Sequence, residues 1–203
     1  MKKLPLLLFV IFALGIADAV AQKTAFDFFS EGQKKYSEKD IDGAMTAFNG
    51  AVALDPHHAL SHTYRGLILR TRKDFDGAIA AYTKAIESGI FNKAAPESYA
   101  DDYGNRGRIF LEQKNDLDAA IADLTKAIET GKSGFRSTHL SNRAKAYTRK
   151  GNHEGSIGDY TELIKGYPTA AIYYTMRAGS YRSSGKIALA EADERTAAEL
   201  KKK

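Results

Sequence analysis

The chain has 203 residues and a formal net charge of +5 at pH 7, from 30 lysines and arginines against 25 aspartates and glutamates. This mild basicity does not by itself indicate a nucleic-acid partner. The chain contains no cysteine, which excludes disulfides, thiolate metal sites, a cysteine nucleophile and a lipid-modified cysteine. Its stability must therefore come from packing alone.

The segment 1–21 has the pattern of a secretory signal peptide. Lys2 and Lys3 precede an apolar run at 4–16, and the small residues at 19–21 stand before Gln22, which predicts cleavage after Ala21. The run is shorter than the roughly 20 residues that a membrane-spanning helix needs, so a retained anchor is the minor alternative. We expect an exported, periplasmic chain that begins at Gln22 and has no stable membrane insertion.

Small residues then recur at a fixed spacing. The step from Gly32 to Gly66 equals the step from Ala144 to Ala178, and both match the period of about 34 residues in a helix-turn-helix solenoid. Paired amphipathic helices of this kind bury their apolar faces only by stacking on neighbouring pairs. The sequence predicts one domain over 22–203, with units at about 25–58, 59–92, 100–134, 137–170 and 171–203.

Three features interrupt the regular pattern. The step from Gly66 to Gly107 is longer than the period, and the extra length lies in an insertion at about 88–96. The step from Gly107 to Ala120 exceeds the equivalent step from Gly66 to Ala78 by one, so the turn inside the third unit is slightly longer than that of the second. In the fifth unit Glu194 replaces the expected ring, as a solvent-facing terminal helix requires.

A short motif surrounds the small residue of the first helix. Asn105-Arg106-Gly107 and Asn142-Arg143-Ala144, with the segment 122–128, resemble the tetratricopeptide repeat family, in the bacterial exported type where an arginine precedes the small residue. Glu31 and Met176 depart from this pattern. The resemblance implies an all-α, right-handed α-solenoid of about five helix-turn-helix units.

Arginines and aspartates recur in register in the last three units. An arginine precedes the small residue of each first helix, and an aspartate follows three residues after the small residue of each second helix. We predict three ion pairs between paired helices, because a partly buried arginine needs a carboxylate, with solvated side chains as the alternative. These pairs are Arg106 with Asp123, Arg143 with Asp159, and Arg177 with Asp193. Arg65 has Ala81 at the acid position, so its partner must lie elsewhere.

In the tetratricopeptide repeat family the first helices line a concave groove. Carried over by position, the groove residues of this chain are Phe29, Gln33, Tyr64, Arg70, Asn105, Arg108, Asn142, Lys145, Arg149 and Arg182. Asn105 and Asn142 resemble the asparagines with which peptide-binding members hold a ligand backbone. The basic lining faces only Asp101 and Glu112, which favours an acidic or C-terminal segment as partner. An ordinary charged helix face is the alternative.

Catalytic and metal-binding patterns are weak. His58 and His62 have the i, i+4 spacing of a metal pair, but no acid stands at a matching third position, so turn and packing roles are expected. We find no nucleophile elbow and no Gly-rich phosphate loop in the sequence. We therefore predict that the chain is no enzyme and needs no cofactor.

The predicted function is a protein or peptide interaction scaffold in the bacterial cell envelope that binds its partners through the concave groove, with the oligomeric state left open. The alternative is a structural subunit of a larger periplasmic assembly. Such a subunit would use its convex face, its ends or the insertion at 88–96, where Ile90 and Phe91 are expected to be exposed. A hydrolase or metal enzyme ranks third.

Overall fold

The computed structural model describes residues 23–131 and 134–202, and within these ranges the chain forms ten α-helices and two short helical turns. The predicted signal peptide at 1–21 lies outside the described residues. In chain order the elements are α1 (Ala25–Ser37), α2 (Ile41–Leu54), α3 (Ala59–Thr71), α4 (Phe75–Phe91), η1 (Pro96–Ser98), α5 (Ala100–Ile109), η2 (Phe110–Lys114), α6 (Leu117–Thr130), α7 (Arg136–Lys150), α8 (His153–Gly166), α9 (Ala171–Ser183) and α10 (Ile187–Leu200).

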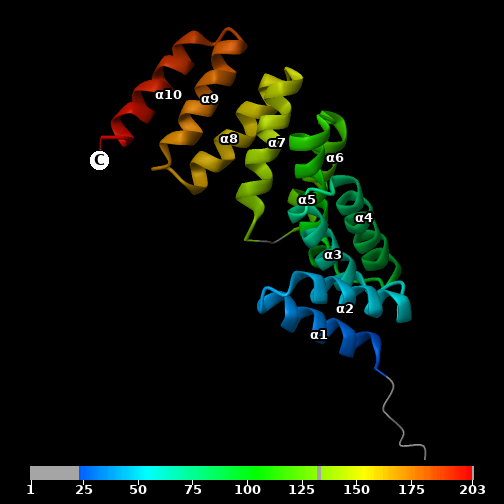
Figure 1. The fold of residues 1–203 in the computed structure, drawn as a ribbon. Coiled ribbons are helices and arrows are strands. Elements are labelled where there is room, and N and C mark those ends of the chain that lie inside the picture. The colour runs from blue at the N-terminus through cyan, green and yellow to red at the C-terminus, as the bar shows by residue number, and fades with distance from the viewer. Residues whose placement is uncertain (1–22, 132–133, 203) are drawn as a thin grey trace, which may run out of the picture.

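The helices form five antiparallel pairs that stack into a curved solenoid, with α1 at one end and α10 at the other (Figure 1). Each first helix after α1 packs against the second helix of its own pair and against the second helix of the preceding pair. This arrangement confirms the predicted all-α solenoid of five units. No helix within the described ranges is long and apolar enough to cross a membrane.

A side-chain cap begins the second helix in each of the first four units. The cap is an aspartate or asparagine that accepts a hydrogen bond from the backbone N–H three residues later, which satisfies one of the free donors at a helix start. The pairs are Asp40 with Gly43, Asp74 with Gly77, Asp116 with Ala119, and Asn152 with Gly155. In the fifth unit Lys186 holds this position and makes no side-chain cap.

The small residues of the first helices make room for rings from the second helices. A Cβ at Gly66 would lie 2.7 Å from Cε1 of Tyr82, and one at Gly32 would lie 2.5 Å from Cε1 of Phe48. Both rings are fully buried. Glycine is therefore required at these two positions by close packing, since any side chain would push the helices apart.

The extra length between the second and third units forms an added turn of helix in α4 and a longer connection that contains η1. α4 has 17 residues, whereas α2 has 14, and its last ring, Phe91, stacks on His57 with the centroids 3.7 Å apart. The amide of Asn92 donates to the backbone oxygen of His57 at 2.9 Å. The turn at the end of α4 thus packs back on the loop before α3.

The extra residue of the third unit forms a π-helical turn, η2, at the end of α5. Asn115 follows it in the left-handed conformation, with φ of 54°. π-Helical structure occurs mostly as such single turns within α-helices, and here it accommodates the added residue. It places the carbonyl of Leu111 and the side chain of Asn115 beside the next unit, where Arg149 contacts both.

A second series of ion pairs runs along the outside of the solenoid. In each of the first four units an acid in the first turn of the second helix pairs with a base at or near the end of the next first helix. The pairs are Asp42 with Arg72, Asp76 with Lys114, Asp118 with Lys150, and Glu154 with Lys186. We call this series the outer ladder. It links every unit to the next one.

Candidate functional site

Three arginines hold the first helices in place, and the predicted ion pairs are confirmed. Nε and Nη2 of Arg106 donate to the two carboxylate oxygens of Asp123 at 2.7 and 2.8 Å. The same two-point geometry joins Arg143 to Asp159 and Arg177 to Asp193. The Asp193 carboxylate raises the pKa of Arg177 because it accepts hydrogen bonds from the charged guanidinium.

A third bond from each arginine was not foreseen from the sequence. Nη1 of Arg106 donates to Oγ1 of Thr83 in the preceding unit, at 2.8 Å. Arg143 and Arg177 bond in the same way to Thr125 and Thr161, at 3.0 Å each. These threonines recur two residues after the position of the acid, which is the signal that would have revealed them. Each arginine therefore joins its own unit to the one before.

Arg65 lacks this arrangement. Its Nη1 lies 3.2 Å from Nδ1 of His62, whose Nε2 lies 3.0 Å from the backbone oxygen of Pro56. One tautomer satisfies both contacts: Nε2 carries the proton and donates to Pro56, and Nδ1 accepts from Arg65. Burial lowers the pKa of His62, which favours this neutral form. The buried Nε of Arg65 has no partner in the described part of the chain.

The first helices α3, α5, α7 and α9 line one continuous surface, which we call the groove, and two cavities open along it. The first cavity has a volume of about 530 Å³ and lies between α3, α5 and α7. It brings together four residues that the sequence placed in the groove, Arg70, Asn105, Arg108 and Asn142. Nη1 of Arg70 donates to Oδ1 of Asn105 at 3.1 Å, so these two side chains position each other.

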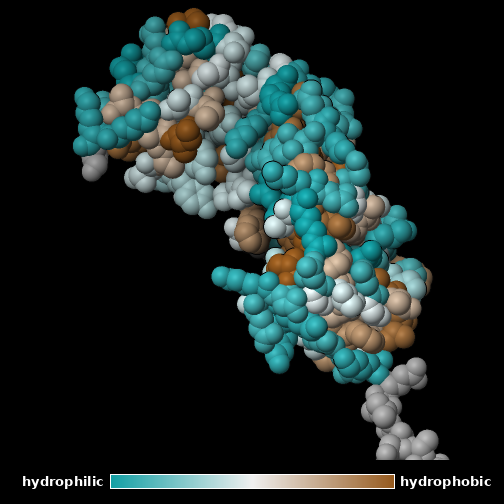
Figure 2. All heavy atoms as spheres, in the orientation of Figure 1, coloured by the Kyte–Doolittle hydropathy of each residue, from teal (hydrophilic) through white to brown (hydrophobic). Residues whose placement is uncertain are grey.

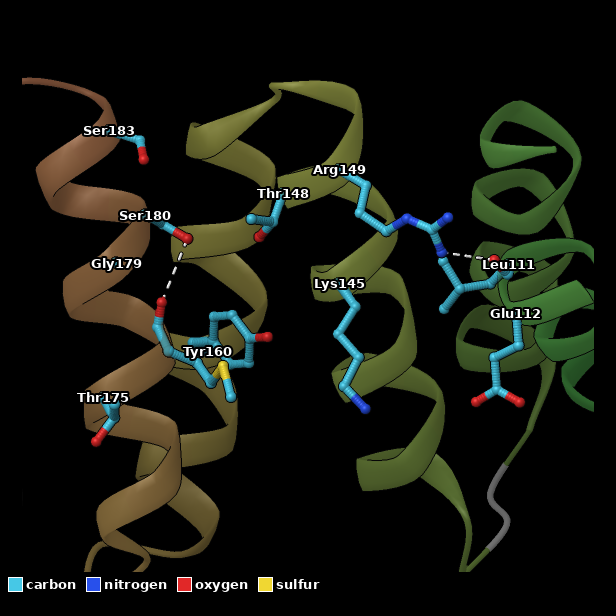
Figure 3. Close-up of a pocket in the computed structure, with 11 residues that line it drawn as sticks. Leu111, Glu112, Lys145, Thr148, Arg149, Tyr160, Thr175, Gly179, Ser180 and Ser183 are labelled. Atoms are coloured by element: carbon cyan, nitrogen blue, oxygen red, sulfur yellow. Dashed lines mark hydrogen bonds between the residues drawn. The ribbon is translucent and has the colours of Figure 1, made fainter. Parts of the chain in front are cut away.

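The second cavity has a volume of about 430 Å³ and lies between η2, α7 and α9, with Tyr160 of α8 also lining it (Figure 3). It contains the predicted residues Lys145 and Arg149. Arg149 donates from Nη1 to the Leu111 carbonyl at 2.6 Å and from Nη2 to Oδ1 of Asn115 at 2.5 Å. Arg149 is thus fixed to the π turn. Lys145 has no ion-pair partner in residues 23–131 and 134–202, and its ammonium projects toward the same end of the cavity as Glu112 in Figure 3.

Four predicted groove residues line neither cavity. The prediction for Phe29 is wrong, because its ring is only 5 % exposed and packs against Phe48 and Tyr64 in the core. Position alone misled here, since a large ring gains more by turning into the aromatic core than by facing water. The amide of Gln33 donates to the Tyr64 hydroxyl at 3.2 Å, and Arg182 pairs with Glu194 at 2.7 Å.

Two acidic residues at the start of α5 contact the helices on either side. Oδ1 of Asp101 lies 3.3 Å from Nε2 of the buried His139, and Thr63 donates to Oδ2 of Asp102 at 3.0 Å. Asp102 is only 3 % exposed, and its Oδ1 has no partner among the described residues. Burial raises the pKa of Asp102 to about 7, with the neighbouring carboxylate of Asp101 adding to the effect. Asp102 is not among the residues predicted from the sequence.

The surface of the solenoid is largely hydrophilic in the view of Figure 2, with isolated apolar side chains. Among the described residues, no group of three or more histidine, aspartate or glutamate side chains is placed to hold a metal ion. The groove thus combines two cavities with fixed cations and amides, on a framework that holds the lining helices on both sides.

Two models of the tetratricopeptide repeat match the sequence, one over residues 29–99 and the other over residues 103–130. No curated protein matches it in sequence.

Several solved structures share the fold. The crystal structure of the MamA protein is 21 % identical, with 88 % of this chain and 92 % of that chain covered and a TM-score of 0.74. YrrB, described as a TPR protein with an unusual peptide-binding site, is 14 % identical over 87 % of this chain and 86 % of its own, with a TM-score of 0.75. PilW, described as a widely conserved type IV pilus biogenesis factor, is 15 % identical over 88 % and 78 %, with a TM-score of 0.64.

Proposed function

Because this chain belongs to the tetratricopeptide repeat family, we propose that it is a non-catalytic scaffold that binds a protein or peptide in its groove. The observation that carries this proposal is the pair of neighbouring cavities along the first helices. Their lining contains four cations, Arg70, Arg108, Lys145 and Arg149, and two carboxylates, Asp101 and Glu112, for a net charge of +2 (4 − 2). Such a lining favours an acidic segment or a C-terminal carboxylate.

Both terminal helices carry charged residues at positions where inner units have apolar ones, although Phe26 on α1 and Leu189 on α10 are exposed, and these charges favour binding in the groove over stacking of further units. On α10, Glu191 and Glu194 replace the apolar side chains that second helices turn toward the next unit, such as Ile157 and Tyr160. On α1, Lys34 stands where later units bury Ile68, Ile109 or Ala146 against the preceding unit. The outer ladder has no residues to continue it at either end. The fifth unit has Ala188 at the position equivalent to Asp42, and the first unit has Glu38 at the position equivalent to Arg72.

We place this scaffold in the cell envelope. The support is the sequence pattern of residues 1–21, which has the basic start, short apolar run and small-residue cleavage site of an export signal. Cell fractionation of the tagged full chain, with mass spectrometry of its N-terminus, tests this. An N-terminus at Gln22 in a periplasmic fraction supports export, and an intact Met1 in the cytoplasm contradicts it.

The groove is tested by reversing one charge. Lys145→Glu is better suited than a change at Arg149, whose contacts with Leu111 and Asn115 hold two units together. Lys165→Glu is the matched control, because Lys165 is exposed on α8 and lines neither cavity. In pull-downs from envelope extract we expect Lys145→Glu to lose partners that the wild type and Lys165→Glu retain. An identical partner set for all three proteins contradicts binding in the groove.

A structural subunit is the second candidate, favoured by the exposed apolar residues at the end of α4. Ile90 is 56 % exposed and Phe91 is 64 % exposed. A subunit that uses this turn for a permanent contact should associate when purified, whereas a transient peptide binder should be monomeric. Light scattering of the wild type and of Ile90→Ser separates these cases. Association that Ile90→Ser abolishes supports the subunit, and a monomer in both supports the groove.

A further inference from the structure

The second cavity is lined by two small residues on the first helix of the fifth unit. The positions are one and two residues after the recurring small residue. They hold Leu67 and Ile68, Arg108 and Ile109, and Lys145 and Ala146 in units two to four, but Gly179 and Ser180 in unit five. A Cβ built on Gly179 has no atom within 4 Å. At the position of Gly179 the volume that Leu67, Arg108 and Lys145 occupy in the earlier units is therefore open, whereas the next position is already small in the fourth unit, as Ala146.

Three hydroxyl groups at this cavity are already paired with one another. Oγ1 of Thr148 lies 2.7 Å from Oγ of Ser156, and the same Ser156 oxygen lies 2.8 Å from Oγ of Ser180. Ser180 in turn donates to the backbone oxygen of Met176 at 3.4 Å. An apolar occupant would therefore leave none of these three hydroxyls without a partner, which removes the main cost of covering them.

The remaining lining combines apolar side chains with Thr175 and Ser183, and the rim is charged. Leu111, Tyr160 and Met176 line the cavity, and Met176 is 40 % exposed on the open side. On the rim, Lys145 and Arg149 face Glu112 alone, so the rim has a net charge of +1 (2 − 1). Because Arg149 is engaged with the π turn, the cation of the rim that is available to a partner is Lys145.

We propose that this cavity takes one large apolar side chain of an extended peptide, and that Lys145 pairs with a carboxylate on an adjacent residue of the same peptide. We call the cavity the socket. The proposal rests on the proposed function and specifies its partner: a segment in which a leucine- or phenylalanine-sized residue stands next to an aspartate or glutamate. The volume of about 430 Å³ lies in the range of sites that enclose organic groups.

The test fills the socket without removing a contact. Gly179→Leu adds a side chain into open space, and replacing a helical glycine favours the helix, so the variant should fold with a melting temperature no lower than that of the wild type. Gly158→Leu is the matched control. Gly158 is an exposed residue of α8, a Cβ there also has no atom within 4 Å, and it lines neither cavity.

The probe is a fluorescent, terminally blocked peptide of sequence Gly-Ser-Glu-Leu-Glu-Ser-Gly, with two matched versions. One has alanine in place of leucine, and the other has lysine in place of both glutamates. Fluorescence anisotropy should show that the wild type and Gly158→Leu bind the first peptide equally. We expect Gly179→Leu to bind it about tenfold to a hundredfold more weakly, the loss that follows when a leucine side chain is not buried. Both altered peptides should bind the wild type at least about tenfold more weakly.

The outcomes separate the socket from the proposed function. If Gly179→Leu binds the first peptide as well as the wild type does, while Lys145→Glu binds it more weakly, the groove binds peptides and the socket proposal is wrong. If the alanine peptide binds as well as the leucine peptide, the apolar anchor is wrong. If the wild type binds none of the three peptides, the socket proposal is wrong. Pull-downs from envelope extract then still decide whether the groove binds other partners.

Discussion

Arg106 on α5 and Asp123 on α6 meet through two hydrogen bonds of 2.7 and 2.8 Å, and a third donor of the same guanidinium reaches Thr83 of the preceding unit. The pair is largely buried, with 16 % of the arginine side chain and 10 % of the aspartate side chain exposed. A first helix of the groove is thus tied on both sides through one side chain. The position of the groove residues on α5 depends on this contact.

Removing the acid should destabilise the fold strongly. In Asp123→Ala the buried Arg106 loses its carboxylate, and breaking such a pair from one side costs about 3 kcal/mol of the free energy of unfolding. The control is Asp42→Ala, which removes an acid of the outer ladder whose side chain is 94 % exposed, and it should cost less than about 1 kcal/mol. Urea unfolding followed by circular dichroism measures both. Equal losses of unfolding free energy in the two variants would contradict the expectation that the buried pair contributes more than the exposed one.

The sequence could predict these three ion pairs because the repeat places equivalent residues in equivalent surroundings. An arginine before the small residue and an aspartate three residues after the next one meet each time the two helices pair. The same logic reaches the threonines at 83, 125 and 161, which were overlooked. Prediction from repeat position fails where one unit differs from the others. Phe29 turns into the core because the residues around it are aromatic, and its position in the repeat does not reveal these neighbours.

The two glycine environments predict opposite effects of adding one methyl group. Gly66→Ala places a Cβ 2.7 Å from the Tyr82 ring, so the ring or the helix must shift, and we expect a loss of about 1–3 kcal/mol in the free energy of unfolding. Gly158→Ala meets nothing within 4 Å and should gain about 0.5–1 kcal/mol from helix propensity. Thermal melting of the two variants beside the wild type checks the sign of each change.

The buried carboxyl of Asp102 should make the fold less stable as pH rises. Burial raises its pKa from 3.8 to about 7, so between these values the unfolded chain has lost the proton that the folded chain keeps. Stability therefore falls as pH increases from about 4 to 7, and the loss is complete above pH 7. Asp102→Asn removes this dependence, since an amide is neutral at every pH and its oxygen can still accept from Thr63.

We expect Asp102→Asn to match the wild type near pH 4 and to be more stable at pH 8 by roughly 2–4 kcal/mol. Melting temperatures measured at both pH values test this. A variant that is less stable than the wild type at pH 8 contradicts the prediction. That result would mean that the charged carboxylate is stabilised in the folded chain.

The socket and the π turn show the limits of counting residues. The sequence shows one extra residue between Gly107 and Ala120, but such a residue can either lengthen a loop or form a π turn. Here it forms the π turn, and Arg149 donates a hydrogen bond to the Leu111 carbonyl in that turn. The absence of large side chains at Gly179 and Ser180 was also visible. It gained meaning only when the structure placed both residues in the wall of a cavity.

Arg65 offers a test in which stability should rise. Its equivalents in units three to five each bind an aspartate, but the acid position here is Ala81, and the buried Nε of Arg65 has no partner in the described chain. The missing acid can be supplied by Ala81→Asp. If the helices pair as they do in the other units, the new carboxylate accepts from Arg65 and compensates its buried charge. Hydrogen bonds of this charged kind are worth about 1.5–3 kcal/mol.

The control is the same substitution without the arginine. In an Arg65→Met background, Ala81→Asp places an unpaired carboxylate at a position that is 5 % exposed, which should cost several kcal/mol. The double-mutant cycle from urea unfolding isolates the interaction between residues 65 and 81. We expect a favourable coupling and a net gain for Ala81→Asp alone. A coupling near zero would show that the neutral ring of His62, 3.2 Å from Nη1, already fixes Arg65 in a position that no acid at residue 81 can reach.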